Sequence, residues 1–82
     1  MADEIIMYGT TWCPDCYRAK SVLNKSGVTF KWIDIGKDPK AAIEVERINK
    51  GNRSVPTIVF PDGSILVEPS NTELEKKLNQ KT

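Results

Sequence analysis

The sequence contains no histidine, carries almost no net charge and has no long hydrophobic run. Without histidine, the Ser-His and Cys-His catalytic pairs and the commonest zinc ligand are excluded. A net charge of +1, with both signs interleaved along the chain, argues against a role in binding nucleic acid or a polybasic role at a membrane surface. The apolar runs are far shorter than the ~18–20 residues that cross a bilayer. The reactive side chains that remain are carboxylates, lysines and two cysteines, Cys13 and Cys16.

The length of 82 residues fits one domain. An apolar content of 39% and a charged content of 28% are typical of a folded globular chain and not of a disordered or fibrous one. Residues 1–4 include two acidic side chains where a secretory signal would be basic, and no long apolar stretch follows them. We therefore expect a single domain over residues 1–82 in the cytoplasm.

The first half of the chain predicts a βαβ unit. A short apolar run that ends at Gly9 predicts a strand over residues 4–8. Pro14 suits the first position of a helix that runs to about residue 26 and stops at Gly27. The β-branched and aromatic residues of 28–35 predict a second strand. Two strands separated by a helix run parallel through a right-handed crossover.

The second half predicts a helix, a hairpin and a last helix. Asp38 caps the first of these helices, whose buried side carries Ala41, Val45 and Ile48, and Gly51 closes it. Residues 57–60 and 64–67 predict two strands joined by a tight turn at 61–63. Residues 70–73 form a capping box for the last helix. The expected fold class is α/β, in the order βαβαββα, with three helices flanking a four-stranded mixed sheet.

The sequence Cys13-Pro14-Asp15-Cys16 indicates the chemistry. Two cysteines scattered over this length would fall at this spacing only about 2% of the time, which favours a paired role. The motif lies between a predicted strand and a predicted helix, so we expect Cys13 at the helix N-cap and Cys16 one turn inside. Free backbone N–H groups and the helix dipole would stabilise a thiolate at Cys13. Cys16 could then resolve a mixed disulfide formed there.

Three other interpretations of the two cysteines remain open. A structural disulfide across so short a loop would constrain the unfolded chain very little. Two thiols without histidine cannot complete a zinc site in one chain, but two chains sharing a metal or an iron–sulfur cluster would form a non-catalytic binding module. Inert core thiols are a third interpretation, although a helix start beside a turn is seldom deep core. The redox interpretation accounts best for the context.

These motifs together resemble the glutaredoxin branch of the thioredoxin superfamily. The resemblance extends from Ile5 to Leu78 and is strongest to the mycoredoxins, the actinobacterial type. It rests on Trp12-Cys13-Pro14-Asp15-Cys16, Gly51-Asn52-Arg53-Ser54-Val55-Pro56-Thr57, Asp62-Gly63-Ser64 and Pro69-Ser70. It implies a thioredoxin-like fold with a cis Pro56 facing the cysteines. The Val55 backbone could then pair with an extended substrate as an added strand. Alternatively, Pro56 simply begins a strand.

The chain departs from the glutathione-using members of that family in three places. Those proteins carry a Lys before the cysteines, a Tyr between them and a Gly-Gly-x-x-Asp stretch near the last helix. This chain has Thr10, Asp15 and residues 68–71 there, which weakens the case for glutathione. Ser70 and Asn71 at a helix start still offer backbone donors for a carboxylate. Asp15 suits the helix dipole, but its negative charge opposes a thiolate at Cys13.

We therefore expect a monomeric thiol–disulfide oxidoreductase that reduces protein disulfides, or mixed disulfides of proteins with mycothiol or glutathione. Cys13 and Cys16 are the predicted catalytic residues, and we expect no bound cofactor or metal. Electrons would come from a small-thiol pool or a flavoprotein reductase. The alternatives are a redoxin that is fed directly by thioredoxin reductase and serves one specific reductase, or a non-catalytic dimer that binds an iron–sulfur cluster or metal. Trp12 is either a contact surface or a shield for Cys13, and Arg53 could hold a carboxylate. The predicted substrate-binding residues are Thr11, Trp12, Pro14, Asp15, Arg53, Val55, Pro56, Ser70 and Asn71.

Overall fold

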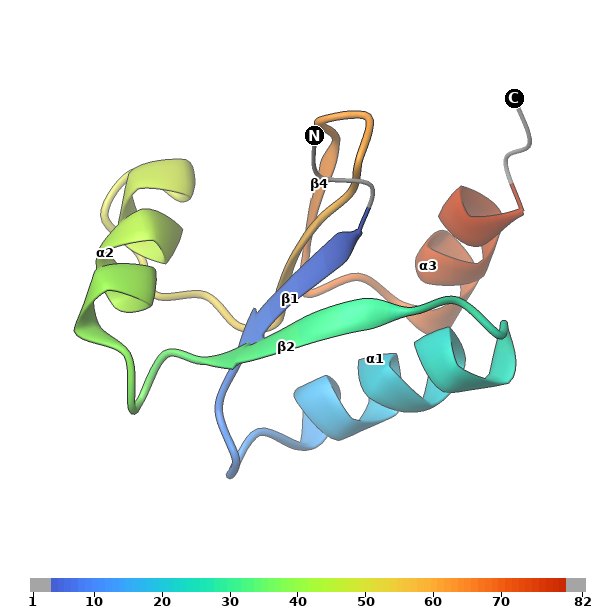
Figure 1. The fold of residues 1–82 in the computed structure, drawn as a ribbon, viewed down its shortest axis with the longest axis horizontal. Coiled ribbons are helices and arrows are strands. Elements are labelled where there is room, and N and C mark those ends of the chain that lie inside the picture. The colour runs from blue at the N-terminus through green and yellow to red at the C-terminus, as the bar shows by residue number, and fades with distance from the viewer. Residues whose placement is uncertain (1–3, 80–82) are drawn as a thin grey trace.

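The computed structural model describes residues 4–79 and confirms the predicted α/β order. The elements are β1 (Ile5–Gly9), α1 (Pro14–Lys25), β2 (Phe30–Asp34), α2 (Pro39–Ile48), β3 (Thr57–Val59), β4 (Ile65–Val67) and α3 (Asn71–Leu78). The strands form one mixed sheet in the order β2-β1-β3-β4 (Figure 1). β1 runs parallel to β2 and antiparallel to β3, which pairs antiparallel with β4. None of the helices in residues 4–79 is long and apolar enough to cross a membrane.

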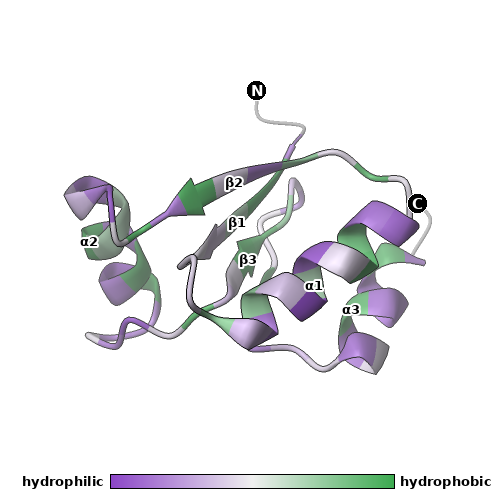
Figure 2. Ribbon diagram, turned by 90° about the horizontal axis from the view of Figure 1, so that it is seen from below, coloured by the Kyte–Doolittle hydropathy of each residue, from purple (hydrophilic) through white to green (hydrophobic). Residues whose placement is uncertain are grey.

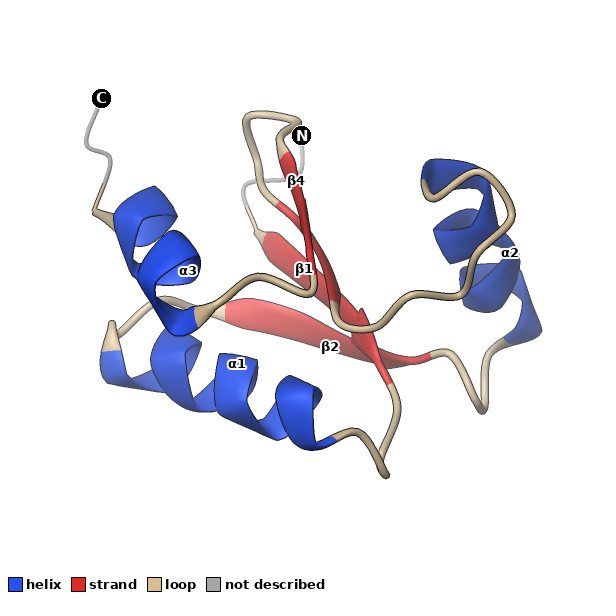
Figure 3. Cartoon of the chain, turned by 180° about the vertical axis from the view of Figure 1, so that it is seen from behind, coloured by secondary structure: helices blue, strands red, loops and turns tan. Residues whose placement is uncertain are grey.

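The helices cover both faces of the sheet. α1 and α3 lie together on one face and α2 lies on the other (Figures 1 and 3). Successive side chains of β1 point to opposite faces, so Met7 packs with the α1 and α3 side and Tyr8 packs with the α2 side. β1 therefore separates two apolar clusters, and its carboxyl end leads directly into the Cys13 motif.

The larger cluster fills the space between the sheet and the pair α1 and α3. Met7, Leu23, Ile58 and Leu74 are fully buried there. Figure 2 shows the matching pattern on the helices, with hydrophilic residues on their outer surfaces. On α2, Ala42 is buried beside the predicted Ala41 and Val45, whereas Ile48 is only half-buried. Burial of these apolar side chains is the main contribution to the stability of so small a domain.

Gly51 closes α2, as predicted. The last helical residue is Ile48, and the chain then turns through Lys50 and Gly51, whose φ angles are +56° and +101°. The Gly51 N–H donates to the Glu46 carbonyl at 2.7 Å, which gives the last turn a Schellman-type closure. A lysine therefore occupies a left-handed position that sequence rules assign to glycine. Gly27, by contrast, follows α1 with a φ of +73°, as predicted.

β4 is shorter than predicted and forms one edge of the sheet. It begins at Ile65 because the Ser64 N–H and hydroxyl both donate to Asp62 and hold Ser64 in the preceding turn. After Val67 the chain turns at Glu68, which has a φ of +48°, and passes into buried Pro69. The edge strand is thus limited to three residues.

Candidate active site

The two cysteines lie in the first turn of α1, as predicted. Cys13 is the N-cap residue, with extended backbone, and Pro14 is the first helical residue. The Cys13 Sγ accepts a hydrogen bond from the Cys16 N–H at 3.1 Å. A sulfur in this position faces the positive end of the helix dipole, which stabilises negative charge.

The two thiols have different surroundings. Cys13 is half-buried and borders solvent, whereas Cys16 is 1% exposed. Gly9 lies directly behind Cys16: a Cβ at this position would be 2.7 Å from the Cys16 Sγ and 2.6 Å from the Trp32 ring. The backbone of β1 therefore comes so close to Cys16 and Trp32 that position 9 requires glycine. This backbone also covers the inner side of the Cys16 thiol. A substrate sulfur can reach Cys13 and cannot reach Cys16.

Burial raises the pKa of the Cys16 thiol to about 12, and a hydrogen bond with Cys13 acts in the same direction. The Thr10 backbone opposes this shift, and the nearby charges of Cys13 and Asp15 add to it. Cys16 therefore keeps its proton at neutral pH until a reaction at Cys13 changes its surroundings. Within residues 4–79, no group of three Cys, Asp or Glu side chains gathers closely enough to hold a metal ion.

The reduced protein should lose stability as the pH rises above 9. The Cys16 thiol of the unfolded chain, with a pKa near 9.0, then loses its proton, whereas the folded protein holds that proton until about pH 12. Because the unfolded state binds fewer protons in this window, the free energy of unfolding falls with pH. Urea titrations from pH 7 to pH 11 under reducing conditions, compared with Cys16→Ala, would measure this contribution. Parallel pH profiles for the two proteins would contradict it.

A second segment brings Val55 to the cysteines. The Val55–Pro56 peptide is cis, as the resemblance implied, and the Val55 carbonyl lies 3.9 Å from the Cys13 Sγ. Buried Thr57 holds this loop from behind: its hydroxyl donates to the Ser54 carbonyl at 2.7 Å and accepts from the Asn49 side chain at 3.1 Å. The backbone beside Cys13 is therefore held by a partly buried chain of hydrogen bonds that reaches to the end of α2.

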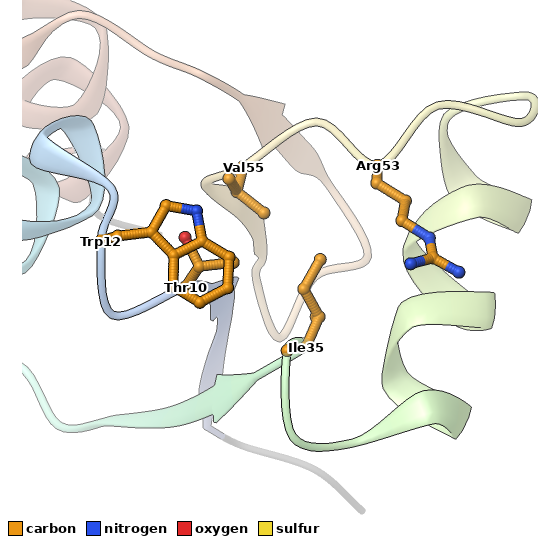
Figure 4. Close-up of a pocket in the computed structure, with 6 residues that line it drawn as sticks. Thr10, Trp12, Ile35, Arg53 and Val55 are labelled. Carbon is orange, nitrogen blue, oxygen red and sulfur yellow. The ribbon is translucent and has the colours of Figure 1, made fainter.

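A pocket of about 320 Å³ lies next to the Cys13 motif, because its lining includes Trp12, which precedes Cys13, and Val55, whose carbonyl is 3.9 Å from the Cys13 Sγ (Figure 4). It is lined by Thr10, Trp12, Ile35, Gly36, Arg53 and Val55. Trp12 is 73% exposed and forms one wall, so its indole offers an open apolar surface beside the thiol. The Arg53 side chain extends towards α2, where its Nε donates to Glu46 Oε2 at 2.5 Å. Sequence reasoning missed Glu46, because nothing in the local pattern pairs it with Arg53.

On the other side of the motif, Arg18 joins α1 to the start of α3. Its guanidinium donates to Asn71 Oδ1 at 2.6 Å and to the Pro69 carbonyl at 3.2 Å, and lies 3.4 Å from the Asp15 carboxylate. The sequence did not predict this role. The spacing of three residues between Asp15 and Arg18 is one at which side chains on a helix can pair, so this part of the contact could have been expected. Ser70 closes the predicted capping box: its N–H donates to Glu73 at 2.8 Å, and its hydroxyl accepts from the Glu73 N–H. Of the predicted anion-binding donors, the Ser70 N–H is thus already engaged by Glu73, while the Asn71 side chain accepts from Arg18.

The remaining predicted site residues lie around Cys13. Thr11 is exposed in the turn before the motif, and its carbonyl accepts a hydrogen bond from the Tyr17 hydroxyl at 2.8 Å. Pro14 and Asp15 are exposed on the first turn of α1, while Pro56 is buried behind Val55. The structure thus brings Trp12, Cys13 and Val55 together, and places Ser70 and Asn71 on the far side of the motif, beside Arg18.

Comparison with known proteins agrees with this arrangement. The glutaredoxin family model matches residues 5–65. A Mycobacterium tuberculosis protein named as a glutaredoxin is 40% identical over 74 residues, covering 90% of this chain and 88% of its own. Mycoredoxin 1 of Corynebacterium glutamicum is 34% identical over 75 residues, and the match covers 92% of this chain and 92% of that protein.

Solved structures show the same fold. A glutaredoxin from Archaeoglobus fulgidus superposes with a TM-score of 0.82 at 29% identity, covering 95% of this chain and 88% of that one. The thioredoxin-like protein BC3987 superposes with a TM-score of 0.78 at 26% identity, covering 89% of this chain and 97% of that one. The fold is therefore thioredoxin-like, the accessible thiol lies at its helix N-terminus, and the chain belongs to the glutaredoxin family of thiol–disulfide oxidoreductases.

Proposed function

We propose that this protein reduces disulfides through Cys13 as the attacking thiol and Cys16 as the resolving thiol. The observation that carries the proposal is the contrast between them: the Cys13 sulfur is accessible at a helix N-terminus, whereas the Cys16 thiol is buried and its pKa is raised to about 12. An attacking thiol must be accessible to the substrate disulfide and able to ionise. A resolving thiol must remain protonated and unreactive until the mixed disulfide has formed.

In the first step, the Cys13 thiolate attacks one sulfur of the substrate disulfide. A bond forms between the two sulfurs, and the second substrate sulfur leaves as a thiolate with the bonding electron pair. Cys16 then gives up its proton and attacks the Cys13 Sγ, which expels the remaining substrate sulfur. The substrate has gained two electrons, and Cys13 and Cys16 are joined as a disulfide. A small thiol attacking the same intermediate would resolve it without Cys16.

Substrate contacts follow from the groups around Cys13. The Val55 backbone would pair with an extended chain, while Trp12, Thr11 and Pro14 would supply contact surface around the sulfur. Electrons would return from a small-thiol pool or a flavoprotein reductase. The likeness to mycoredoxin 1 supports mycothiol as one such thiol. A cytoplasmic location fits a dithiol that has to be reduced again after each cycle.

Two coupled assays of NADPH oxidation test the proposal. One supplies a mixed disulfide with glutathione or mycothiol and the matching reductase; the other supplies insulin with thioredoxin reductase. We expect turnover in at least one of them, with each rate proportional to enzyme concentration. Turnover only in the first identifies the small thiol, and turnover only in the second identifies a redoxin fed by thioredoxin reductase. The absence of turnover in both assays would overturn the catalytic proposal and favour a role in binding an iron–sulfur cluster.

A further inference from the structure

Among the described residues, the pocket next to the Cys13 motif contains one charged lining residue, Arg53, and the charge of Arg53 is balanced by an ion pair with Glu46. Thr10 contributes a hydroxyl whose oxygen is buried without a hydrogen-bond partner in residues 4–79, and Trp12, Ile35 and Val55 contribute apolar surface. A carboxylate that entered this pocket would therefore depend on Arg53 for a countercharge.

Arg53 lines the pocket, but Glu46 turns its guanidinium towards α2. The guanidinium lies against α2, with its Nε donating to the Glu46 carboxylate, while Thr10 and Trp12 lie on the opposite side of the pocket (Figure 4). Glu46 is well placed to hold it, because the Glu46 carbonyl also closes the last turn of α2 by accepting from the Gly51 N–H. The hydrogen bond from the Gly51 N–H to the Glu46 carbonyl thus fixes the beginning of the short segment that leads to Arg53.

Two other groups that could receive a carboxylate near the Cys13 motif are engaged within the chain. The Ser70 N–H is bound by Glu73, and the Arg18 guanidinium is shared among Asn71, Pro69 and Asp15. Asp15 itself adds a negative charge within the motif. A disulfide that carries carboxylates beside its sulfur would displace internal partners to be bound, whereas an uncharged disulfide would not.

We propose that Glu46 is a positioning residue that sets specificity: by holding Arg53 it disfavours disulfides with a carboxylate near the sulfur and favours uncharged ones. The substrate class is thus a peptide segment or small thiol without a carboxylate beside the reacting sulfur. This inference rests on the proposed function, since the pocket matters only if Cys13 reacts with the substrate.

The test uses two small disulfides that differ only in charge, dithiodipropionic acid and its diamide. Reduced protein is mixed with an excess of either compound at low ionic strength, and the rate constant for loss of protein thiols is measured. The ratio of the acid rate to the diamide rate is the readout, because any general effect on Cys13 or on folding cancels in it. The variants are Glu46→Gln and, as a matched control on the same helix, Glu44→Gln, whose carboxylate pairs with Arg47.

We expect Glu46→Gln to raise the acid-to-diamide ratio about two- to fivefold, the range that an exposed ion pair supports, and Glu44→Gln to leave it unchanged. Added salt should reduce the gain, since the attraction between Arg53 and the carboxylate is screened. Adding Arg53→Gln to Glu46→Gln should return the ratio to its original value. An unchanged ratio in Glu46→Gln, or a gain that survives the loss of Arg53, would overturn the inference. A diamide that fails to react in every variant would instead overturn the proposed function.

Discussion

Replacing Cys13 with serine should reduce disulfide-reductase turnover to the background rate. A serine hydroxyl at this position remains protonated at neutral pH, so it cannot attack a disulfide, and Cys16 is buried at 1% exposure with its pKa raised to about 12. The coupled assays described above measure the loss. Circular dichroism should show that the variant keeps its fold, because the serine oxygen can still accept the Cys16 N–H as an N-cap group.

Cys16→Ser is the informative partner of this variant. Attack by Cys13 should still occur, so one half of the substrate should stay bound to the protein as a mixed disulfide, visible as added mass in intact-protein mass spectrometry. Excess small thiol should release it and restore partial turnover. If Cys13→Ser kept its activity, or if Cys16→Ser failed to form the adduct, the assignment of the two roles would be wrong.

Gly9→Ala should cause a large loss of stability for the addition of a single methyl group. The added Cβ would lie 2.7 Å from the Cys16 Sγ and 2.6 Å from the Trp32 ring, so at least one of them has to move. Overpacking of this kind costs about 1–3 kcal/mol. In a domain of this size, each kcal/mol lowers Tm by roughly 4–8 °C. Thermal and urea denaturation of the reduced protein would measure the change.

A double-mutant cycle identifies the atom responsible. Cys16→Ala removes the sulfur that faces the new methyl group, so the combined variant should lose less stability than the sum of the two single variants. The rescue should be partial, because the Trp32 ring still blocks the site. Strict additivity would show that Gly9 and Cys16 do not compete for the same space.

The features that the sequence predicted well depend on neighbouring residues. Cys13 and Pro14 define a helix start by themselves, and Ser70 with Glu73 defines another, because capping needs only the next few residues. The fold order followed from the same local patterns. Gly51 closes α2 as predicted, whereas the left-handed conformation of Lys50 before it could not be predicted, because the rule assigns that conformation to glycine.

The features that the sequence could not supply depend on which segments meet in space. Arg18 reaches Asn71 and Pro69 across the α1 and α3 contact, and Glu46 reaches Arg53 across the end of α2. A surface arginine on a helix looks the same in sequence whether it is solvated or holds a second helix. The resemblance to glutaredoxins supplied the cis Pro56, which composition and periodicity alone left undecided.

The short β4 edge has a consequence for self-association. An open strand edge is a template on which a second copy of a protein can pair and aggregate, and proteins restrict such edges with short strands, bends and prolines. Here Pro61 lies in the hairpin turn before β4, Glu68 bends the chain after it through a positive φ, and Pro69 follows. The edge therefore offers three residues, of which Ile65 and Val67 have exposed apolar side chains. At this edge a second copy of the protein therefore finds only a short stretch of backbone on which to add a strand.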